Sequence, residues 1–401
     1  MSGARAVLLP ADIRFPLERA SGVQIVKTAA ALAGTGAPTT LLVRRSDPRP
    51  TADILATYGV APHPCLEVRR LGVLHRRGSF LLPRASFLAR ALAQATGALR
   101  RGALVFTRDL QLADLLLRLP GKGGRAVVYE AHAVEALMYG ERAALYGTGE
   151  APDPAKASRL RRREERVWRR AAGFVTTTAG ILATFHDAYG PRERVRVVPN
   201  GCDVPPDRRF PGLSAARPPR VLYAGQLYPW KGVDVLVEAM AEVPEARLVI
   251  LGGLEGERDL ARVRALAEAR GLAGRTEMPG TLPQARVADE LARAAVVTVP
   301  FLRTAMTERH TSPLKAFEAM AAGRPIVASD LPSSREFLRH EHNALLVRPG
   351  DAKALAAALR RVLADAALAE RLARAAWEGA PAYSWDARAR ALRALFDEVP
   401  A

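Results

Sequence analysis

The chain has 401 residues, of which 49% are hydrophobic, and 59 Lys and Arg residues outnumber 41 Asp and Glu residues to give a net charge of +18. At about 150 residues per domain, this length predicts two domains with enough apolar material for two cores. The positive charge favours an anionic partner, such as a phosphorylated small molecule, an anionic membrane surface or a nucleic acid.

Cysteine content and hydropathy indicate the compartment. Cys65 and Cys202 are the two cysteines, too few for a framework of several disulfides, and no Cys/His cluster has zinc-ligand spacing. The opening apolar stretch is too short for a signal peptide, and no run approaches the ~20 apolar residues of a membrane span. We therefore expect a cytoplasmic protein that is soluble or peripheral.

Short β-branched runs alternate with longer helical patterns along the whole chain, which predicts parallel sheets covered by helices on both faces. In the first half, these runs are residues 4–10, 39–45, 103–109, 125–131, 173–179 and 194–200. In the second half, they are residues 219–225, 246–253, 294–300, 324–330 and 343–349.

A segment rich in Pro and Gly at residues 200–219 lacks periodicity and is expected to be a linker. The fold class is therefore α/β, with two Rossmann-like, doubly wound domains that face each other across a cleft. The expected domains are residues 1–199 and 220–380, and residues 381–401 form a further C-terminal segment.

The segment Gly225–Gly232 follows the first strand of the second domain and precedes a helical pattern. A loop in this position directs Lys231 and free backbone N–H groups toward the ligand-binding edge of the sheet. It is a good place for phosphate, although a turn with a solvated Lys would have the same sequence.

A polar cluster stands at the start of a second helix, in the stretch ERHTSPLKAFEAMAAG. Ser312 is a favourable N-cap and Pro313 suits the first helical position, so we expect a helix from there to Gly323. Lys315 in the first turn is disfavoured by the helix dipole and so suggests an anionic ligand. Glu318, on the same side, could accept hydrogen bonds from ligand hydroxyls or pair with Lys315.

Taken together, these segments resemble the retaining family 4 (group 1) glycosyltransferases, which have the GT-B architecture. The stretch VPNGCD is similar to the family segment that precedes the second domain, and GQLYPWKG is similar to its loop ending in Lys-Gly. FEAMAAGRPIVASD is similar to its most specific block. In the first half, YEAHAVE and AAGFVTTTAGILATFHDAYG also resemble the family.

The resemblance implies roles for individual residues in the second domain. Lys231 would bind the donor diphosphate, Glu318 would hold the donor ribose, and the helix start at Ser312–Lys315 would contact the distal phosphate or the sugar. The implied donor-binding set is Gly225, Gln226, Lys231, His310, Thr311, Ser312, Leu314, Lys315 and Glu318. Two positions depart from the family pattern: Gln226 stands where Arg is usual, and His310 stands where a second Glu is usual.

In the first domain, the resemblance implies an acceptor site. Ser21 and Gly22 correspond to the Gly-rich loop on the acceptor side, and the pattern places Gly22 where a helix opens after that loop. His132 corresponds to a His near the transferring carbon, although a His after a strand is also often structural. The implied catalytic residues are therefore His132, Lys231 and Glu318. The chain has no Asp-x-Asp pair, so we expect no metal and no other cofactor, with Lys and helix dipoles in place of the cation.

Three functions are compatible with the sequence. The favoured one is a retaining, metal-independent glycosyltransferase that moves a sugar from a nucleotide-diphosphate donor to a glycan or lipid-linked acceptor, in bacterial surface-polysaccharide or glycolipid synthesis. A GT-B epimerase or phosphorylase is the second. A catalytically silent GT-B partner subunit or binding protein is the third, and His310 and Gln226 favour it. A nucleic-acid partner is not expected, because aromatic residues are 6% of the chain and no standard motif is present.

The positive charge is concentrated in the first half, where 31 basic residues face 16 acidic ones. Between Val68 and Arg101, arginines alternate with apolar residues, and a second basic run spans Arg159–Arg170. Solvated helix faces would explain both patterns. The charge asymmetry and the neighbouring apolar side chains favour contact with an anionic membrane surface instead. The C-terminal pattern SWDARARALRALFDEV is expected to be a helix that, by the resemblance, returns to the first domain.

Overall fold

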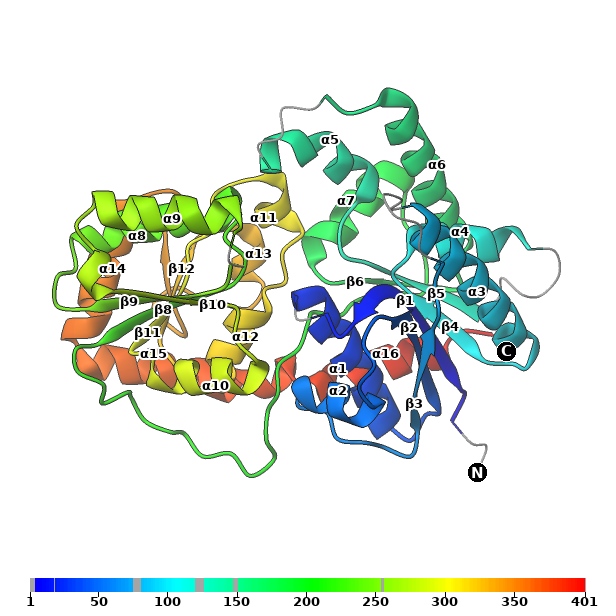
Figure 1. Ribbon diagram of the computed structural model, residues 1–401, viewed down its shortest axis with the longest axis horizontal. Coiled ribbons are helices and arrows are strands. Elements are labelled where there is room, and N and C mark those ends of the chain that lie inside the picture. Colours follow the sequence, from blue (N-terminus) through cyan, green and yellow to red (C-terminus); the bar gives the residue numbers. More distant parts are fainter. Residues whose placement is uncertain are drawn as a thin grey trace. The chain divides into compact units, whose positions relative to one another are not determined.

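The protein contains two parallel β-sheets (Figure 1). The computed structural model describes residues 4–17, 19–74, 81–119, 126–146, 151–253 and 256–400. The chain divides into two compact units. The first unit holds residues 1–140, 152–200 and 385–401, and the second holds residues 141–151 and 201–384. Each unit is built around one of the sheets, which confirms the predicted α/β class with two Rossmann-like units.

The first sheet has seven strands in the order β3-β2-β1-β4-β5-β6-β7, and its neighbouring strands are parallel. The central strands are buried on both faces, as expected for apolar runs in a parallel sheet. The strands are β1 (Val7–Phe15), β2 (Thr39–Arg45), β3 (Leu66–Leu71), β4 (Leu104–Thr107), β5 (Val127–Ala131), β6 (Gly173–Thr176) and β7 (Val195–Val197).

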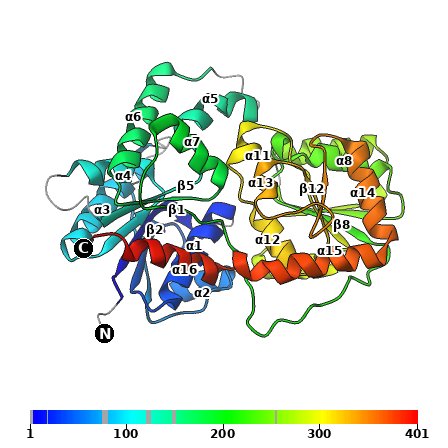
Figure 2. The same ribbon diagram turned by 180° about the vertical axis from the view of Figure 1, so that it is seen from behind.

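Helices cover both faces of this sheet. One face carries α1 (Ala20–Gly34), α2 (Thr51–Thr57) and α16 (Trp385–Asp397), and Figure 2 shows α16 in red beside α1. The other face carries α3 (Leu81–Arg100), α4 (Leu110–Arg118), α6 (Pro154–Arg170) and α7 (Ala179–Tyr189). Leu392 and Phe396 of α16 are buried with Val26 of α1, so the last helix of the chain completes the core of the first unit. Helix α5 (Glu135–Tyr146) follows β5.

The second sheet has six parallel strands in the order β10-β9-β8-β11-β12-β13, so the strand order reverses between β8 and β11. In an open α/β sheet, ligands bind beyond the carboxyl ends of the strands at such a point. The strands are β8 (Arg220–Ala224), β9 (Arg247–Leu251), β10 (Thr276–Gly280), β11 (Val296–Val299), β12 (Ile326–Ser329) and β13 (Leu345–Val347).

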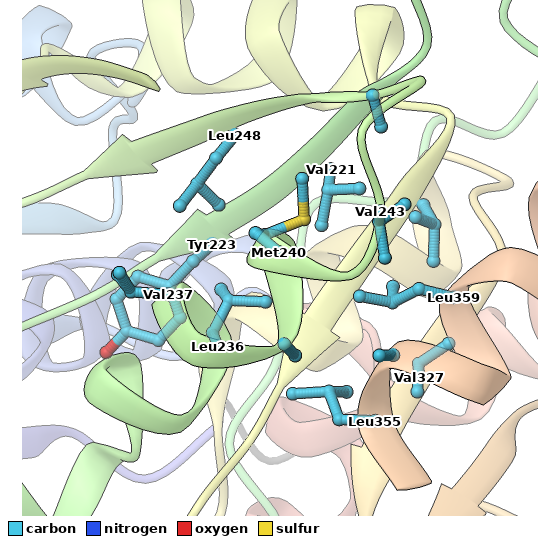
Figure 3. Close-up of a cluster of buried hydrophobic side chains, with 14 of the residues drawn as sticks. Val221, Tyr223, Leu236, Val237, Met240, Val243, Leu248, Val327, Leu355 and Leu359 are labelled. Carbon is cyan, nitrogen blue, oxygen red and sulfur yellow. The ribbon is translucent and has the colours of Figure 1, made fainter. Parts of the chain in front are cut away.

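The helices of the second unit form two cores with its sheet. The core in Figure 3 joins Val221 and Tyr223 of β8 to helices α8 (Val233–Ala241), α9 (Arg258–Ala269) and α14 (Ala352–Ala364). The opposite core uses α10 (Gln284–Arg293) and α12 (Leu314–Ala321). Helix α15 (Ala366–Gly379) contributes Leu372 to the first core and Ala376 to the second. The short elements are η2 (Pro229–Lys231), η3 (Ala273–Arg275), α11 (Ala305–Arg309), α13 (Pro332–Arg335) and η4 (Ala380–Tyr383).

The basic segment between Val68 and Arg101 differs from the amphipathic segment that its sequence suggests. Its beginning belongs to strand β3, and its second part is α3. Phe87 and Leu88, two of the apolar residues on which the expected membrane contact rests, are 1% and 7% exposed and pack in the core. Leu74 and Leu81 are exposed, at 56% and 81%. Arg76, Arg77 and Phe80 lie outside the described residues.

No helix in the described ranges is long and apolar enough to cross a membrane.

Candidate active site

Lys231 lies in the segment that joins β8 to α8, at the end of the short turn η2. Its Nζ atom is 4.2 Å from the centre of the Trp230 ring and 4.4 Å from that of Phe301. Burial lowers the pKa of Lys231 to about 7. Among the described residues, no carboxylate forms an ion pair with this amine. Lys231 is therefore only partly protonated at neutral pH, and an anionic ligand would stabilise its charged form.

The Lys231 segment packs against the segment that follows β11. Gly232 has a φ of +72°, and a Cβ atom there would lie 1.8 Å from the carbonyl oxygen of Pro300. The amide of Leu302 donates to the carbonyl of Trp230 over 3.0 Å. At position 232, only glycine combines this positive φ with the close approach of Pro300 without strain. These contacts hold Lys231 at the point where the strand order of the second sheet reverses.

Glu318 lies on α12 and uses both of its carboxylate oxygens. Its Oε2 atom is 2.7 Å from Nζ of Lys315, and its Oε1 atom accepts a hydrogen bond of 3.0 Å from Nε2 of Gln284. The sequence left open whether Glu318 pairs with Lys315 or accepts hydroxyls, and the structure shows the pair. A ligand hydroxyl would have to share this carboxylate with Lys315 or displace it.

The start of α12 differs from the sequence prediction. The helix begins at Leu314, and Pro313 is the N-cap with no side-chain capping bond, so the prediction of Ser312 as N-cap was wrong. Pro313 has extended backbone angles, φ −82° and ψ 112°, which delay the first helical residue. The amides of Leu314 and Lys315 have no acceptor in the described part of the chain. They are available donors beside the Lys315 ammonium group.

The segment before α12 holds the other residues implied in donor binding. His310 is the C-cap of α11, is 4% exposed, and has a pKa lowered to about 4 by burial and then by Arg309. It is therefore neutral at neutral pH, unlike a carboxylate. The hydroxyl of Thr311 donates to the carbonyl of Met306 over 2.9 Å. After β8, the hydroxyl of Tyr223 donates to the carbonyl of Gln226 over 2.6 Å.

A buried ion pair occupies the end of β5 in the first unit. Glu130 is 2% exposed and pairs with Arg388 of α16, which is 3% exposed. Arg388 also donates to the hydroxyl of Thr28 and to the carbonyls of Val198 and Pro199, over 3.0, 2.8 and 2.9 Å. Burial opposes the charge of Glu130, but Arg388 and then His132 outweigh it and hold its pKa well below the ordinary range. We call these residues, with Gln24, Arg108 and His132, the Glu130 network.

His132 lies directly after β5, with Nε2 at 3.3 Å from Oε2 of Glu130. Gln24 donates to the same oxygen over 3.3 Å, and Arg108 donates to Oε1 of Gln24 over 2.7 Å. Burial and then the charge of Arg108 lower the pKa of His132 to about 4, against the attraction of Glu130. The imidazole is therefore neutral at pH 7, so it can donate a hydrogen bond and accept one.

Ser21 and Gly22 lie within the first turn of α1, which begins at Ala20. The helix therefore begins before Gly22, and the loop that was expected to hold Ser21 and Gly22 lies before Ala20. A Cβ atom on Gly22 would lie 2.0 Å from the carbonyl oxygen of Leu17. Glycine at this position therefore allows the chain entering α1 to pass close to the helix.

Several residues of these sites have no role in the sequence prediction. They are Gln24, Arg108, Glu130, Gln284 and Arg388. A carboxylate inside the apolar run of β5 is a signal that would identify Glu130. Arg388 offers no comparable signal, because 258 residues separate it from Glu130. In the described ranges, no group of three or more His, Cys, Asp and Glu side chains is arranged to hold a metal ion.

Comparison with known proteins identifies the family. Residues 218–365 match the family described as Glycosyl transferases group 1, and residues 20–201 match the Glycosyl transferase 4-like domain. These matches cover both units. The chain belongs to the group 1 glycosyltransferases, as the sequence motifs suggest.

Two curated relatives are bacterial proteins named D-inositol 3-phosphate glycosyltransferase. The one from Xylanimonas cellulosilytica is 32% identical over 253 residues, which are 59% of this chain and 59% of that protein. The one from Acidothermus cellulolyticus is 32% identical over 275 residues, or 64% of this chain and 58% of that protein. The chain thus aligns with less than two thirds of the length of either relative.

Two solved structures share the fold over nearly the whole chain. Sucrose-phosphate synthase from Thermosynechococcus elongatus has a TM-score of 0.70 and 22% identity, with 98% of both chains covered. Anabaena HepE in complex with UDP and glucose has a TM-score of 0.67 and 17% identity, with 97% of this chain and 98% of that chain covered. At these identities the likeness shows the fold, which is the GT-B architecture.

Proposed function

We propose that this protein is a retaining, metal-independent glycosyltransferase. It would take a nucleotide-diphosphate sugar as donor and a glycan or lipid-linked molecule as acceptor, in bacterial surface-polysaccharide or glycolipid synthesis. The observation that carries the proposal is Lys231, a half-buried lysine at the reversal point of the second sheet that forms no ion pair with a carboxylate of the described residues. Loss of a nucleoside diphosphate from a sugar develops negative charge on the leaving group, and a held cation there lowers the barrier.

The roles that we propose for the other residues are supported by their positions and by the family. Lys315 and the amides of Leu314 and Lys315 at the start of α12 would bind the distal phosphate or the sugar, and Glu318 would hold the ribose. His132, neutral and fixed by Glu130, would face the transferred sugar, while Ser21 and Gly22 would lie on the acceptor side. Gly225, Gln226, His310, Thr311, Ser312 and Leu314 complete the proposed donor site.

Nucleotide binding is the direct test. We expect Lys231→Ala and Glu318→Gln each to weaken binding of UDP or GDP, or turnover, at least tenfold, which is about 1.4 kcal/mol. Lys353→Ala is the matched control, because Lys353 is an exposed lysine of the same unit. If both variants bind these nucleotides and remain active like the parent, the site assignment is wrong.

Metal independence and stereochemistry have separate tests. Activity should persist in excess EDTA. Proton NMR spectra recorded during turnover should show that the product has the same anomeric configuration as the donor sugar. A chelator-sensitive reaction would contradict the first expectation, and an inverted product would contradict the second.

The domain roles are also a proposal. Residues 1–199 and the helix within 381–401 would bind the acceptor, residues 220–380 would bind the nucleotide sugar, and residues 200–219 would link them. Donor binding should then draw the two domains together. Small-angle scattering at saturating donor would show a smaller radius of gyration, and an unchanged radius would count against closure.

Contact with an anionic membrane surface on the cytoplasmic side is the final part of this proposal. The support comes from α6, where Lys156, Arg159, Arg161, Arg162, Arg169 and Arg170 are exposed. Its apolar residues Val167 and Trp168 are buried, so the contact would be electrostatic. Sedimentation with anionic vesicles at low salt should exceed that with neutral vesicles, and equal negligible binding would contradict it.

The buried, neutral His310 favours one alternative, a catalytically silent GT-B partner subunit. Slow hydrolysis of a nucleotide sugar by the purified protein without acceptor would exclude that alternative. Binding of nucleotide sugars without hydrolysis or transfer to any acceptor would favour it.

A further inference from the structure

Arg108 carries a guanidinium group that the fold leaves largely unpaired. It directly follows β4, one of the two strands between which the order of the first sheet reverses. Its Nη1 atom donates to Oε1 of Gln24 over 2.7 Å, and in the described part of the chain it forms no ion pair. Burial lowers its pKa below the ordinary value, and the attraction of Glu130 does not restore it.

Arg388, the neighbouring guanidinium in the Glu130 network, shows the contrast. Arg388 donates to Thr28, to two carbonyl groups and to Glu130. A guanidinium group has five N–H donors, and Arg108 uses one of them within the described chain. The carboxylate of Glu130 contacts Arg388, Gln24 and His132, and among the described residues it forms no ion pair with Arg108.

Gln24 holds Arg108 in place. Its amide oxygen accepts from Arg108, and its amide nitrogen donates to Glu130, so both neighbours fix the same orientation of the amide. The adjoining cavity has about 20 Å³ of space and is lined by Gln24, Thr28, Thr107, Arg108 and Glu130 together with apolar residues. That volume suits one water molecule. A sugar or a phosphate is too large for it and would meet Arg108 outside the cavity.

We propose that Arg108, positioned by Gln24, binds an anionic oxygen group, a phosphate or a carboxylate, on the acceptor substrate. This inference rests on the proposed function, in which the first unit takes the acceptor. A guanidinium group binds such anions through two parallel N–H donors, and a partly desolvated site strengthens the interaction. Gln24 and Glu130 connect Arg108 to His132. An acceptor bound at Arg108 would therefore contact the same network that contains the neutral imidazole of His132.

The first experiment uses inorganic phosphate as the probe, in the full-length protein. Calorimetric titration is done in the Lys231→Ala background, so that phosphate binding to the proposed donor site is reduced. We expect Arg108→Gln to weaken phosphate binding at least tenfold. Arg100→Gln is the matched control, because it removes the same charge from an exposed position just before β4, and it should change the affinity less than twofold.

The second experiment compares acceptor sources. Glucose 6-phosphate and glucuronate are compared with glucose, and phosphatidylglycerol vesicles with phosphatidylcholine vesicles. If binding of the soluble anions depends on Arg108, the anionic group belongs to a soluble acceptor. If only binding of the anionic vesicles depends on Arg108, the anionic group belongs to a lipid-linked acceptor. If Arg108→Gln binds phosphate, the soluble anions and the vesicles like the parent, the inference is overturned.

Nucleotide binding separates this inference from the proposed function. Arg108→Gln in the otherwise unchanged chain should bind UDP or GDP like the parent, because Arg108 belongs to the first unit. If the parent binds no nucleotide while phosphate binding still depends on Arg108, the proposed donor fails and the anion site remains.

Discussion

Replacing Arg388 with Met should destabilise the first unit strongly, because it leaves Glu130 as a buried charge without its ion-pair partner. Glu130 is 2% exposed, and Arg388 is its only guanidinium partner in the described ranges. Removing one member of such a pair costs about 3–5 kcal/mol. The carbonyls of Val198 and Pro199 lose their donor as well. For a unit of this size, the loss corresponds to a fall in Tm of roughly 6–20 °C.

Chemical denaturation and differential scanning calorimetry measure this effect. Arg390→Met is the matched control, because Arg390 lies two residues further along α16, is exposed, and has no ion pair within the described chain. Its effect should stay within ~0.5 kcal/mol. The double variant Glu130→Gln/Arg388→Met should be more stable than the sum of the single losses predicts, because it removes the unpaired charge.

The pH dependence gives an independent reading of the same ion pair. In the parent, the pKa of Glu130 is below its ordinary value of 4.5. The ion pair therefore stabilises the folded state above pH 4.5, and this contribution to the free energy of unfolding is lost as the pH falls below that value. In Arg388→Met, burial would raise this pKa, and protonation would remove the buried charge. The stability difference between parent and variant should therefore shrink from pH 7 to pH 4. If Arg388→Met and Arg390→Met have equal stability at pH 7, the ion pair does not hold the unit together.

Three further predictions concern the second unit. Because the pKa of Lys231 is about 7, nucleotide binding at pH 8 should take up nearly one proton, as calorimetry in buffers of different ionisation enthalpy would show, and Lys231→Ala should abolish the uptake. Gly232→Ala should cost roughly 1–3 kcal/mol through its overlap with Pro300, whereas Gly274→Ala, in open space at an ordinary φ, should be near neutral in denaturant titration. The pKa of His310 is lowered from 6.5 to about 4, so its contribution to stability is lost as the pH falls between these values, and His310→Gln should flatten the stability profile there.

Periodicity in the sequence was sufficient to predict the α/β class and most strands of both sheets. The apolar runs became β1, β2, β4 to β9 and β11 to β13, and the central strands among them are buried on both faces of a parallel sheet, which favours apolar residues. The edge strands β3 and β10 were not predicted. Like the predicted edge strands β7 and β13, they pair along one side only, but their sequences contain charged or turn-forming residues in place of a continuous apolar run.

Local sequence also indicated the candidate donor site, because Lys231, Lys315 and Glu318 stand in loops and helix starts that follow strands of one sheet. Their partners were not predictable. Phe301 and Gln284 come from other strand ends and helices, and only packing brings them against Lys231 and Glu318. The start of α12 at Leu314 is also set by neighbouring residues. It depends on the backbone angles of Pro313, which the capping pattern in the sequence does not specify.

The Glu130 network was decided by tertiary structure. Gln24, Arg108, Glu130 and Arg388 are ordinary polar residues in α1, after β4, in β5 and in α16, and none belongs to a short motif with another. They meet because α16 packs beside α1 on the first sheet and brings Arg388 to the end of β5. A sequence pattern records which faces of a helix are apolar, whereas the partner of a buried charge depends on which elements the closed core places around it.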